Sequence, residues 1–235
     1  MSFLVSVWQW FADPTHWSGP EGIPQRLLEH VQLSAESVAV GALIALPIGI
    51  ALGHYGRFGN LAINISNVGR AIPSFGLLVI AFQAWGLGDL PIIVTLAALA
   101  IPPMVTNSYV ALSEVDPDIK EAARAMGYRE LTQLLRVELP LAVPLVMAGI
   151  RTSAVQVVAT MTLAAIIAGG GFGRYVIDGI AQQNYQMMFA GALLVALLAI
   201  ATELSLSGVE RLLVPRGLRL LRTQGRVRAI IAKAA

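Results

Sequence analysis

The chain has 235 residues, of which 56% are hydrophobic and 13% are charged, and its mean hydropathy is +0.71. This share of charged residues is too small to cover the surface of a soluble domain of this size. The composition therefore indicates an integral membrane protein. The absence of cysteine excludes disulfides and thiolate-bound metals. The formal net charge of +2 is small, so it gives no indication of nucleic-acid binding.

The first 30 residues lack the marks of a removable signal peptide. They contain an apolar run, but no positively charged start and no small-residue cleavage pattern. Acids outnumber bases in this segment, and Trp8, Trp10 and Trp17 belong to a residue type that gathers at lipid headgroups. We therefore expect residues 1–30 to form an extracytoplasmic segment at the membrane interface.

Five apolar segments follow, and each is long enough to cross roughly 30 Å of hydrocarbon. They predict an all-α, polytopic membrane protein with a transmembrane domain at residues 31–210. Residues 211–235 form a tail with seven bases and no acid. The expected spans lie at about residues 33–54, 61–85, 91–112, 141–168 and 187–206.

The second span has features that fit a transport path better than a packing helix. Pro73, with Gly69 and Gly76 nearby, predicts a break near mid-membrane. Arg70 costs roughly 3 kcal/mol to insert, so it should face a partner or an aqueous cavity. The alternative is that Arg70 extends its charge to the cytoplasmic surface.

Polar residues in two later spans are further candidates for this path. In the third span Pro102 and Pro103 predict an interruption, and Asn107 beyond it either lines a pore or bonds to freed backbone groups. Polar side chains of the fourth span either pack helices closely or line a wet path. The candidate path residues are Arg70, Pro73, Ser74, Asn107, Arg151, Gln156 and Thr160.

A polar stretch at residues 113–140 separates the third and fourth spans, and it holds six of the 14 acids and four of the 16 bases. Asp116 precedes a proline and can cap a helix, which Gly127 can end in a left-handed turn. A second helix fits residues 129–138, before Pro140 starts the next apolar segment. The pattern predicts a helix-turn-helix between two spans.

The distribution of bases predicts the topology. The polar stretch and the tail hold most of the bases, whereas the turn after the second span has none. The positive-inside rule therefore places the polar stretch and the C-terminus in the cytoplasm. Five spans then place the N-terminus outside.

The sequence GGGFG at residues 169–173 ends the fourth span. No Lys-Ser or Lys-Thr pair follows it, so it does not match a phosphate-binding loop. We expect a flexible turn at the membrane surface, followed by a short polar helix at residues 174–183.

The string EAARAMG, nine further residues and then VELP resemble the signature loop of permease subunits in ABC importers, of the MetI-like type I class. In that loop a conserved EAA and glycine precede a final (I/V)-x-LP at fixed spacing. Seven residues match the signature: Glu121, Ala122, Ala123, Gly127, Val137, Leu139 and Pro140.

The resemblance implies an assembly in a bacterial or archaeal cytoplasmic membrane. Two permease subunits, either identical or different, form the path, two ATP-binding cassette subunits dock on the signature loops, and an extracytoplasmic binding protein delivers the substrate. This chain has no GxxxxGK(S/T) nucleotide loop, so ATP and Mg²⁺ are expected on the partner ATPase. We predict no catalytic site, metal site or cofactor in the chain itself.

Motifs such as NVGRAIPSFGLL, AGIRTSAV and TLAAIIAGGGFGRYVIDGI are similar to the glycine betaine, carnitine and choline branch of these permeases. Arg70, Gly69 and Glu203 depart from that branch, so an amino acid or another small polar solute is the alternative substrate. A channel or secondary transporter is a more remote alternative, because the spans offer mainly cationic ionisable residues. No metalloprotease or serine-hydrolase motif indicates a membrane-embedded enzyme.

Overall fold

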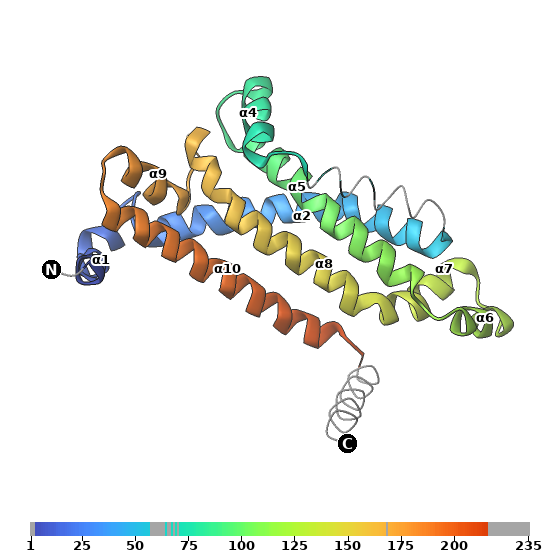
Figure 1. Cartoon of the computed structure of the whole chain (residues 1–235). Coiled ribbons are helices and arrows are strands. Elements are labelled where there is room, and N and C mark those ends of the chain that lie inside the picture. The colour runs from blue at the N-terminus through green and yellow to red at the C-terminus, as the bar shows by residue number, and fades with distance from the viewer. Residues whose placement is uncertain are drawn as a thin grey trace, which may run out of the picture.

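The computed structural model describes residues 3–56, 64, 67, 69, 71–167 and 169–215. These residues form helices joined by short turns, with no strand among them, which confirms the predicted all-α class (Figure 1). The elements in chain order are α1 (Phe3–Ala12), η1 (Pro14–Trp17), α2 (Ile23–Tyr55), α4 (Ser74–Trp85), α5 (Asp89–Ser113), α6 (Pro117–Ala125), α7 (Glu130–Gln133), η2 (Leu134–Glu138), α8 (Leu139–Thr160), η3 (Met161–Ile167), α9 (Gly173–Ala181) and α10 (Tyr185–Leu213).

Four helical segments among the described residues are long and apolar enough to cross a membrane. They are Ile23–Tyr55, Asp89–Ser113, Glu130–Ile167 and Tyr185–Leu213. They correspond to the first, third, fourth and fifth predicted spans. Most of the first half of the second predicted span, including Arg70, lies outside the described residues. Its second half is α4, a 12-residue apolar helix that begins directly after Pro73.

The first membrane helix is longer than the predicted span at residues 33–54. It begins at Ile23, with Gly22 before it and Pro24 in its first turn, where a missing N–H leaves no carbonyl unpaired. Residues 23–30, expected in the interfacial segment, therefore belong to α2. Because α2 has 33 residues, its first turns extend beyond the apolar run that the sequence marks as a span.

α2 and α5 lie side by side because glycines remove the side chains between them. A Cβ built on Gly41 would lie 3.0 Å from the Cβ of Ala100, and one on Gly49 would lie 2.8 Å from the Val105 carbonyl oxygen. A Cβ on Gly53 would come within 2.6 Å of a backbone oxygen of α5. Small residues at spacings of four and eight are typical of close helix pairs in membranes.

The prolines of α5 do not interrupt it, contrary to the prediction. The helix continues through Pro102 and Pro103 to Ser113. Side chains bond to the backbone here: Thr106 Oγ1 donates to the Pro102 carbonyl at 3.0 Å, and Ser153 Oγ of α8 donates to the Ala100 carbonyl at 2.8 Å. These bonds lie beside the proline pair and tie this part of α5 to itself and to α8.

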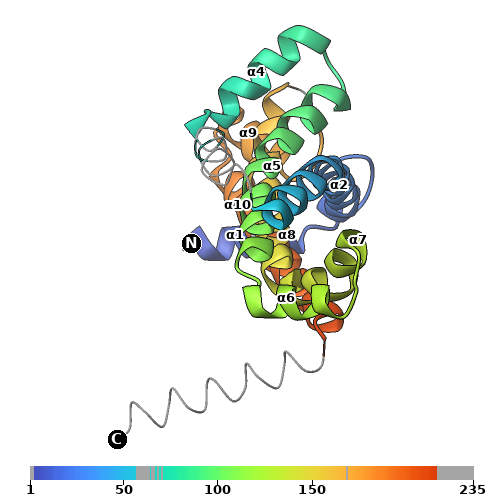
Figure 2. The same cartoon turned by 90° about the vertical axis from the view of Figure 1, so that its right-hand side faces the viewer.

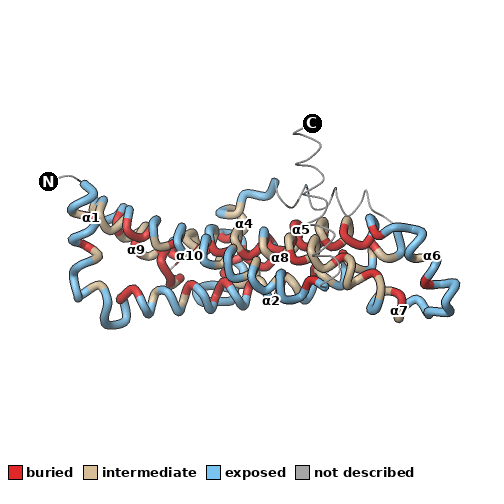
Figure 3. Tube along the Cα trace, turned by 90° about the horizontal axis from the view of Figure 1, so that it is seen from below, coloured by how far each residue is buried: buried red, intermediate tan, exposed pale blue. Residues whose placement is uncertain are grey.

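The elongated bundle has two distinct ends (Figures 1 and 2). α1 and α9 lie at one end, and α6 and α7 lie at the other, while α4 projects from the side. Buried residues run along the facing sides of α5 and α8, and the outer sides of the helices are exposed (Figure 3). The long helices thus present apolar outer surfaces that suit a lipid environment.

Candidate functional site: a helical hairpin at one end of the bundle

The hairpin starts with the short helix α6, whose limits agree with the prediction. Asp116 precedes the helix, and its carboxylate accepts a hydrogen bond from the Asp118 N–H at 2.9 Å. Gly127 follows the helix with φ +82°, a left-handed conformation that favours glycine. Capping and the glycine turn therefore set both ends of α6 locally, without help from tertiary contacts.

The second arm of the hairpin is not the separate helix predicted at residues 129–138. α7 continues through η2, a π-helical turn, into α8 without a break, so the arm and the fourth span form one helical segment. In η2 the Leu139 N–H bonds to the Leu134 carbonyl, five residues earlier. This wide turn precedes Pro140 directly, and it accommodates a ring that clashes with a regular helical turn.

The signature residues divide between the outside and the base of the hairpin. Glu121, Ala122 and Gly127 are exposed, whereas Ala123 is buried. The three remaining positions, Val137, Leu139 and Pro140, are half-buried where the second arm joins the bundle. The first group is free to contact another protein, and the second group contacts the spans.

An apolar surface covers the outer side of the hairpin. The residues exposed there include Met126 and Leu131, with 68% and 66% of their surface accessible. Tyr128 and Leu135 are exposed as well. Large apolar side chains at a polar end of a membrane protein indicate a contact surface for another protein.

A cluster of charged and polar side chains fills the base of the hairpin. We call it the base cluster, and its members are His54, Lys120, Gln133 and Glu138. Glu138 Oε2 lies 2.9 Å from His54 Nδ1 and 3.7 Å from Lys120 Nζ, and Gln133 Nε2 donates to Glu138 Oε1 at 2.7 Å. Glu138 is the one acid of the base cluster, and its side chain is 0% exposed.

Sequence reasoning missed Glu138 and His54. Glu138 occupies the position of the VELP string at which the signature accepts any residue, so the motif gives it no weight. His54 belongs to no sequence motif, and it lies in the last turn of α2. An acid between two apolar residues, directly before a proline-containing apolar run, is the signal that could have indicated a buried charge.

The predicted path residues do not form one continuous surface in the described part of this chain. Ser74 and Thr160 line the same narrow crevice between α4, α5 and the end of α8. Asn107 donates to the Pro103 carbonyl of its own helix at 2.8 Å. Gln156 is half-buried on α8, Pro73 is exposed before α4, and Arg70 lies outside the described residues.

Arg151 is paired with two acids of α10. Its Nε lies 2.9 Å from Glu203 Oε1, and its Nη1 lies 2.9 Å from Glu210 Oε2. Arg151 and Glu210 line a cavity of about 380 Å³ between α5, α8 and α10, together with Glu114. The ion pairs of Arg151 with Glu203 and Glu210 were therefore not predicted from the sequence, which indicated mainly cationic residues in the spans.

The glycine-rich turn at the opposite end is anchored, not flexible as predicted. The Gly171 N–H donates to Glu29 Oε2 at 2.8 Å, and the Phe172 N–H donates to His30 Nδ1 at 3.2 Å. His30 also bonds through Nε2 to the Val158 carbonyl at 2.9 Å. The turn is thus tied to α2 and, through His30, to α8.

A family model described as "binding-protein-dependent transport system inner membrane component" matches residues 45–217. The chain belongs to this family. It is a multi-pass membrane protein and the permease component of a binding-protein-dependent transport system. The matched region includes the whole hairpin and its base cluster.

Curated relatives of the permease share about a third of its residues. The choline transport system permease protein OpuBB of Bacillus subtilis is 34% identical over 83% of this chain and 89% of its own length. The glycine betaine/carnitine/choline permease OpuCB of the same organism is 33% identical over 81% and 88%. The osmoprotectant import permease OsmW of Salmonella typhimurium is 32% identical over 81% and 91%.

Solved structures confirm the fold of the permease. A chain of the inward-facing methionine ABC transporter MetNI superposes with a TM-score of 0.72 at 22% identity, covering 82% of this chain and 96% of that chain. A chain of an amino acid ABC transporter gives a TM-score of 0.61 at 18% identity, covering 90% and 97%. At these identities the likeness concerns the fold alone, and it agrees with the predicted MetI-like class.

Proposed function

We propose that the permease forms the membrane path of an ATP-driven importer for osmoprotectants with a quaternary ammonium group, namely glycine betaine, choline or carnitine. The observation that carries the proposal is the identity of 32–34% with permeases named for these solutes, over more than four fifths of the chain. The structural neighbours named for methionine or amino acids are only 18–23% identical. Identity therefore favours the osmoprotectant branch over the amino-acid alternative.

ATP hydrolysis takes place in two partner subunits that dock on the hairpin. Met126 and Leu131 are exposed, and the small side chain of Ala122 leaves the adjacent face of α6 thin. Together they form an apolar surface that can fit into a groove of the partner subunit. ATP and Mg²⁺ bind to those subunits. Transport requires that the two nucleotide states of the partner contact the hairpin differently, since equal contact shifts no equilibrium.

The hairpin end of the bundle faces the cytoplasm, and the end with α1 and α9 faces outside. Glu114 and Val115, which directly precede the hairpin, line one cavity with Glu210 of α10, and this supports placing the hairpin and the C-terminus on the same side, as the positive-inside rule does. The extracytoplasmic binding protein delivers the solute to the opposite end. A second permease subunit, identical or different, completes the path.

Uptake by the reconstituted importer tests this proposal. The permease would be assembled with its ATPase and binding protein in lipid vesicles, and ATP-dependent entry of labelled choline, glycine betaine and carnitine would be measured. Unlabelled methionine and proline serve as competitors. Saturable uptake of a quaternary ammonium solute, unaffected by the amino acids, is the expected result. Uptake that only an amino acid inhibits would overturn the substrate assignment.

A further inference from the structure

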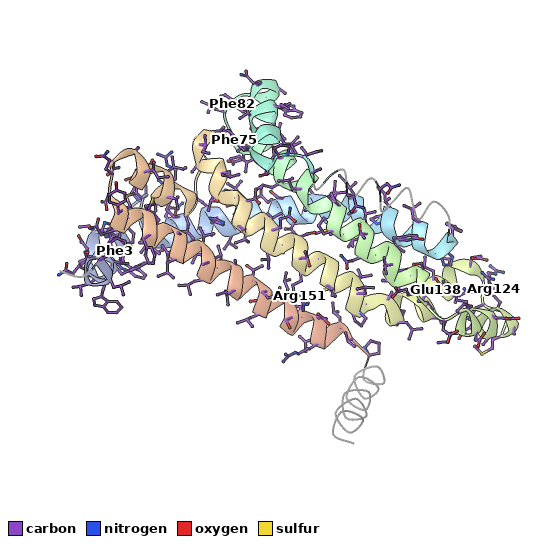
Figure 4. All side chains as sticks on the ribbon, in the orientation of Figure 1. Phe3, Phe75, Phe82, Arg124, Glu138 and Arg151 are labelled. Carbon is purple, nitrogen blue, oxygen red and sulfur yellow. The ribbon has the colours of Figure 1, made fainter. Side chains whose placement is uncertain are left out.

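The base cluster sits where the hairpin meets the spans. His54 comes from the last turn of α2, Lys120 from α6, Gln133 from α7 and Glu138 from η2. Lys120 Nζ also donates to the carbonyl of Leu112 in the last turn of α5, at 2.9 Å. Figure 4 shows Glu138 at the base of the hairpin, with Arg124 further out. Four elements therefore meet at one buried carboxylate, and Lys120 links them to α5.

Burial makes this cluster sensitive to the loss of any partner. The His54 side chain is 4% exposed and that of Lys120 is 18% exposed. A buried charge is tolerated when it is paired and hydrogen-bonded, and removal of one partner leaves the other charge without compensation. The cluster thus holds α6 in one position relative to α2 and α5, and a displaced α6 would separate the charges.

A second carboxylate contacts the same histidine from outside. Glu130 Oε2 lies 3.2 Å from His54 Nε2, and its other oxygen lies 3.9 Å from Arg124 Nη2. The Glu130 side chain is 64% exposed, so water can replace these contacts at little cost. Glu130 and Glu138 therefore present the same chemistry to His54, one at the surface and one in the interior.

We propose that the base cluster is the positioning site that couples the hairpin to the spans, and that Glu138 is its central residue. It fixes α6 to the ends of α2 and α5, so that a force on the hairpin moves these helices instead of bending the hairpin away from them. Without the cluster, the partner's ATP cycle displaces α6 alone. The inference rests on the proposed function, in which a partner ATPase docks on the hairpin.

The variant Glu138→Gln keeps the shape of the side chain and removes its charge. In the reconstituted importer, the solute imported per ATP hydrolysed should fall about tenfold, within the range of typical coupling effects, while ATP hydrolysis changes by less than about twofold. Glu130→Gln is the matched control, because it makes the same change on the other side of His54, and it should keep the wild-type ratio. Equal ratios in the two variants would overturn the proposal.

A double variant separates positioning from folding. If Glu138→Gln lowers the amount of assembled complex, Glu138→Gln/Lys120→Met removes the uncompensated cation and should restore assembly, yet the import ratio should stay about tenfold low. A wild-type ratio in this double variant would contradict the proposal. A parallel fall of import and ATP hydrolysis in both variants would also contradict it, because that result indicates only a structural role.

Amide hydrogen exchange supplies a readout that does not depend on the substrate. In the purified complex, Glu138→Gln should speed exchange in residues 117–127 about tenfold, because α6 loses its attachment to α2 and α5, and Glu130→Gln should not. If the wild-type complex imports no quaternary ammonium solute, but Glu138→Gln speeds exchange and Glu130→Gln does not, the proposed substrate is wrong and the positioning site is supported. Unchanged exchange in Glu138→Gln would overturn the positioning site whatever the substrate.

Discussion

The guanidinium of Arg151 on α8 and the carboxylate of Glu203 on α10 lie 2.9 Å apart, and Glu210 on the same helix holds the other side of the guanidinium at 2.9 Å. One cation thus joins two acids that are separated by about two turns of α10. Without the cation, both acids would repel each other beside an apolar helix pair.

Replacement of this arginine should loosen α10 from α8. Arg151→Met removes the cation that Glu203 and Glu210 share, but their side chains are 44% and 13% exposed, so the loss of stability is about 1–2 kcal/mol, less than for a fully buried pair. Thermal unfolding in detergent measures the effect. Arg151→Lys keeps the positive charge but has a single nitrogen in place of the guanidinium group, and it should lose less stability than Arg151→Met. An unchanged melting temperature for Arg151→Met would show that the ion pairs contribute nothing.

Enlargement of a glycine between α2 and α5 should separate the two helices. In Gly49→Leu the new side chain starts 2.7 Å from the Cβ of Ser108 and 2.8 Å from the Val105 oxygen, and overpacking of this kind costs about 1–3 kcal/mol. Gly208→Ala on α10 is the control, because its Cβ meets nothing within 4 Å, and it should be neutral or stabilising. Chemical unfolding of the two variants provides the comparison.

Gly127 should tolerate asparagine and reject valine. Its φ of +82° is strained for a β-branched residue, so Gly127→Val should disturb the end of α6 at a cost of about 1–2 kcal/mol. Gly127→Asn adopts the left-handed conformation more readily and should retain function. ATP-dependent uptake, compared at equal amounts of assembled complex, measures the difference. Full uptake by the valine variant would refute a role for this turn in coupling.

Tyr175 makes stability decline at high pH. Burial raises the pKa of this phenol from 10.0 to about 12, and its hydroxyl donates to the Glu21 carbonyl at 2.6 Å. The unfolded chain loses the proton first, so the stabilisation is full below about pH 10 and is lost as pH rises toward 12. Unfolding monitored across this range should show the decline. Tyr175→Phe should reduce it, whereas Tyr185→Phe, at an exposed position, should not.

Local signals made the hairpin predictable. Asp116 and Gly127 act through their own backbone neighbours, so sequence alone places both ends of α6. Four of the five membrane spans were predictable for a similar reason, since length and hydropathy decide whether a helix can cross a bilayer. The start of α2 at Ile23 was missed because the first turns of this helix lie before the apolar run. Hydropathy marks where the apolar run begins, not where the helix begins.

Contacts between residues far apart in the chain could not be predicted from the sequence. His54 meets Glu138 across 84 positions, and Gly171 meets Glu29 across 142 positions. No local pattern announces such pairs, because they arise from the packing of whole helices. The prolines misled for a related reason: a proline normally ends a helix, but Pro102 lies within α5, and a π turn accommodates Pro140.

The unbroken segment from Glu130 to Ile167 makes the second arm of the hairpin a lever. Its 38 residues extend about 55 Å at a rise near 1.5 Å per residue, so a rotation of about 5° at one end displaces the other by about 5 Å. A small tilt imposed at the hairpin is therefore magnified at the opposite end of the segment, where η3 lies next to the turn anchored to Glu29 and His30.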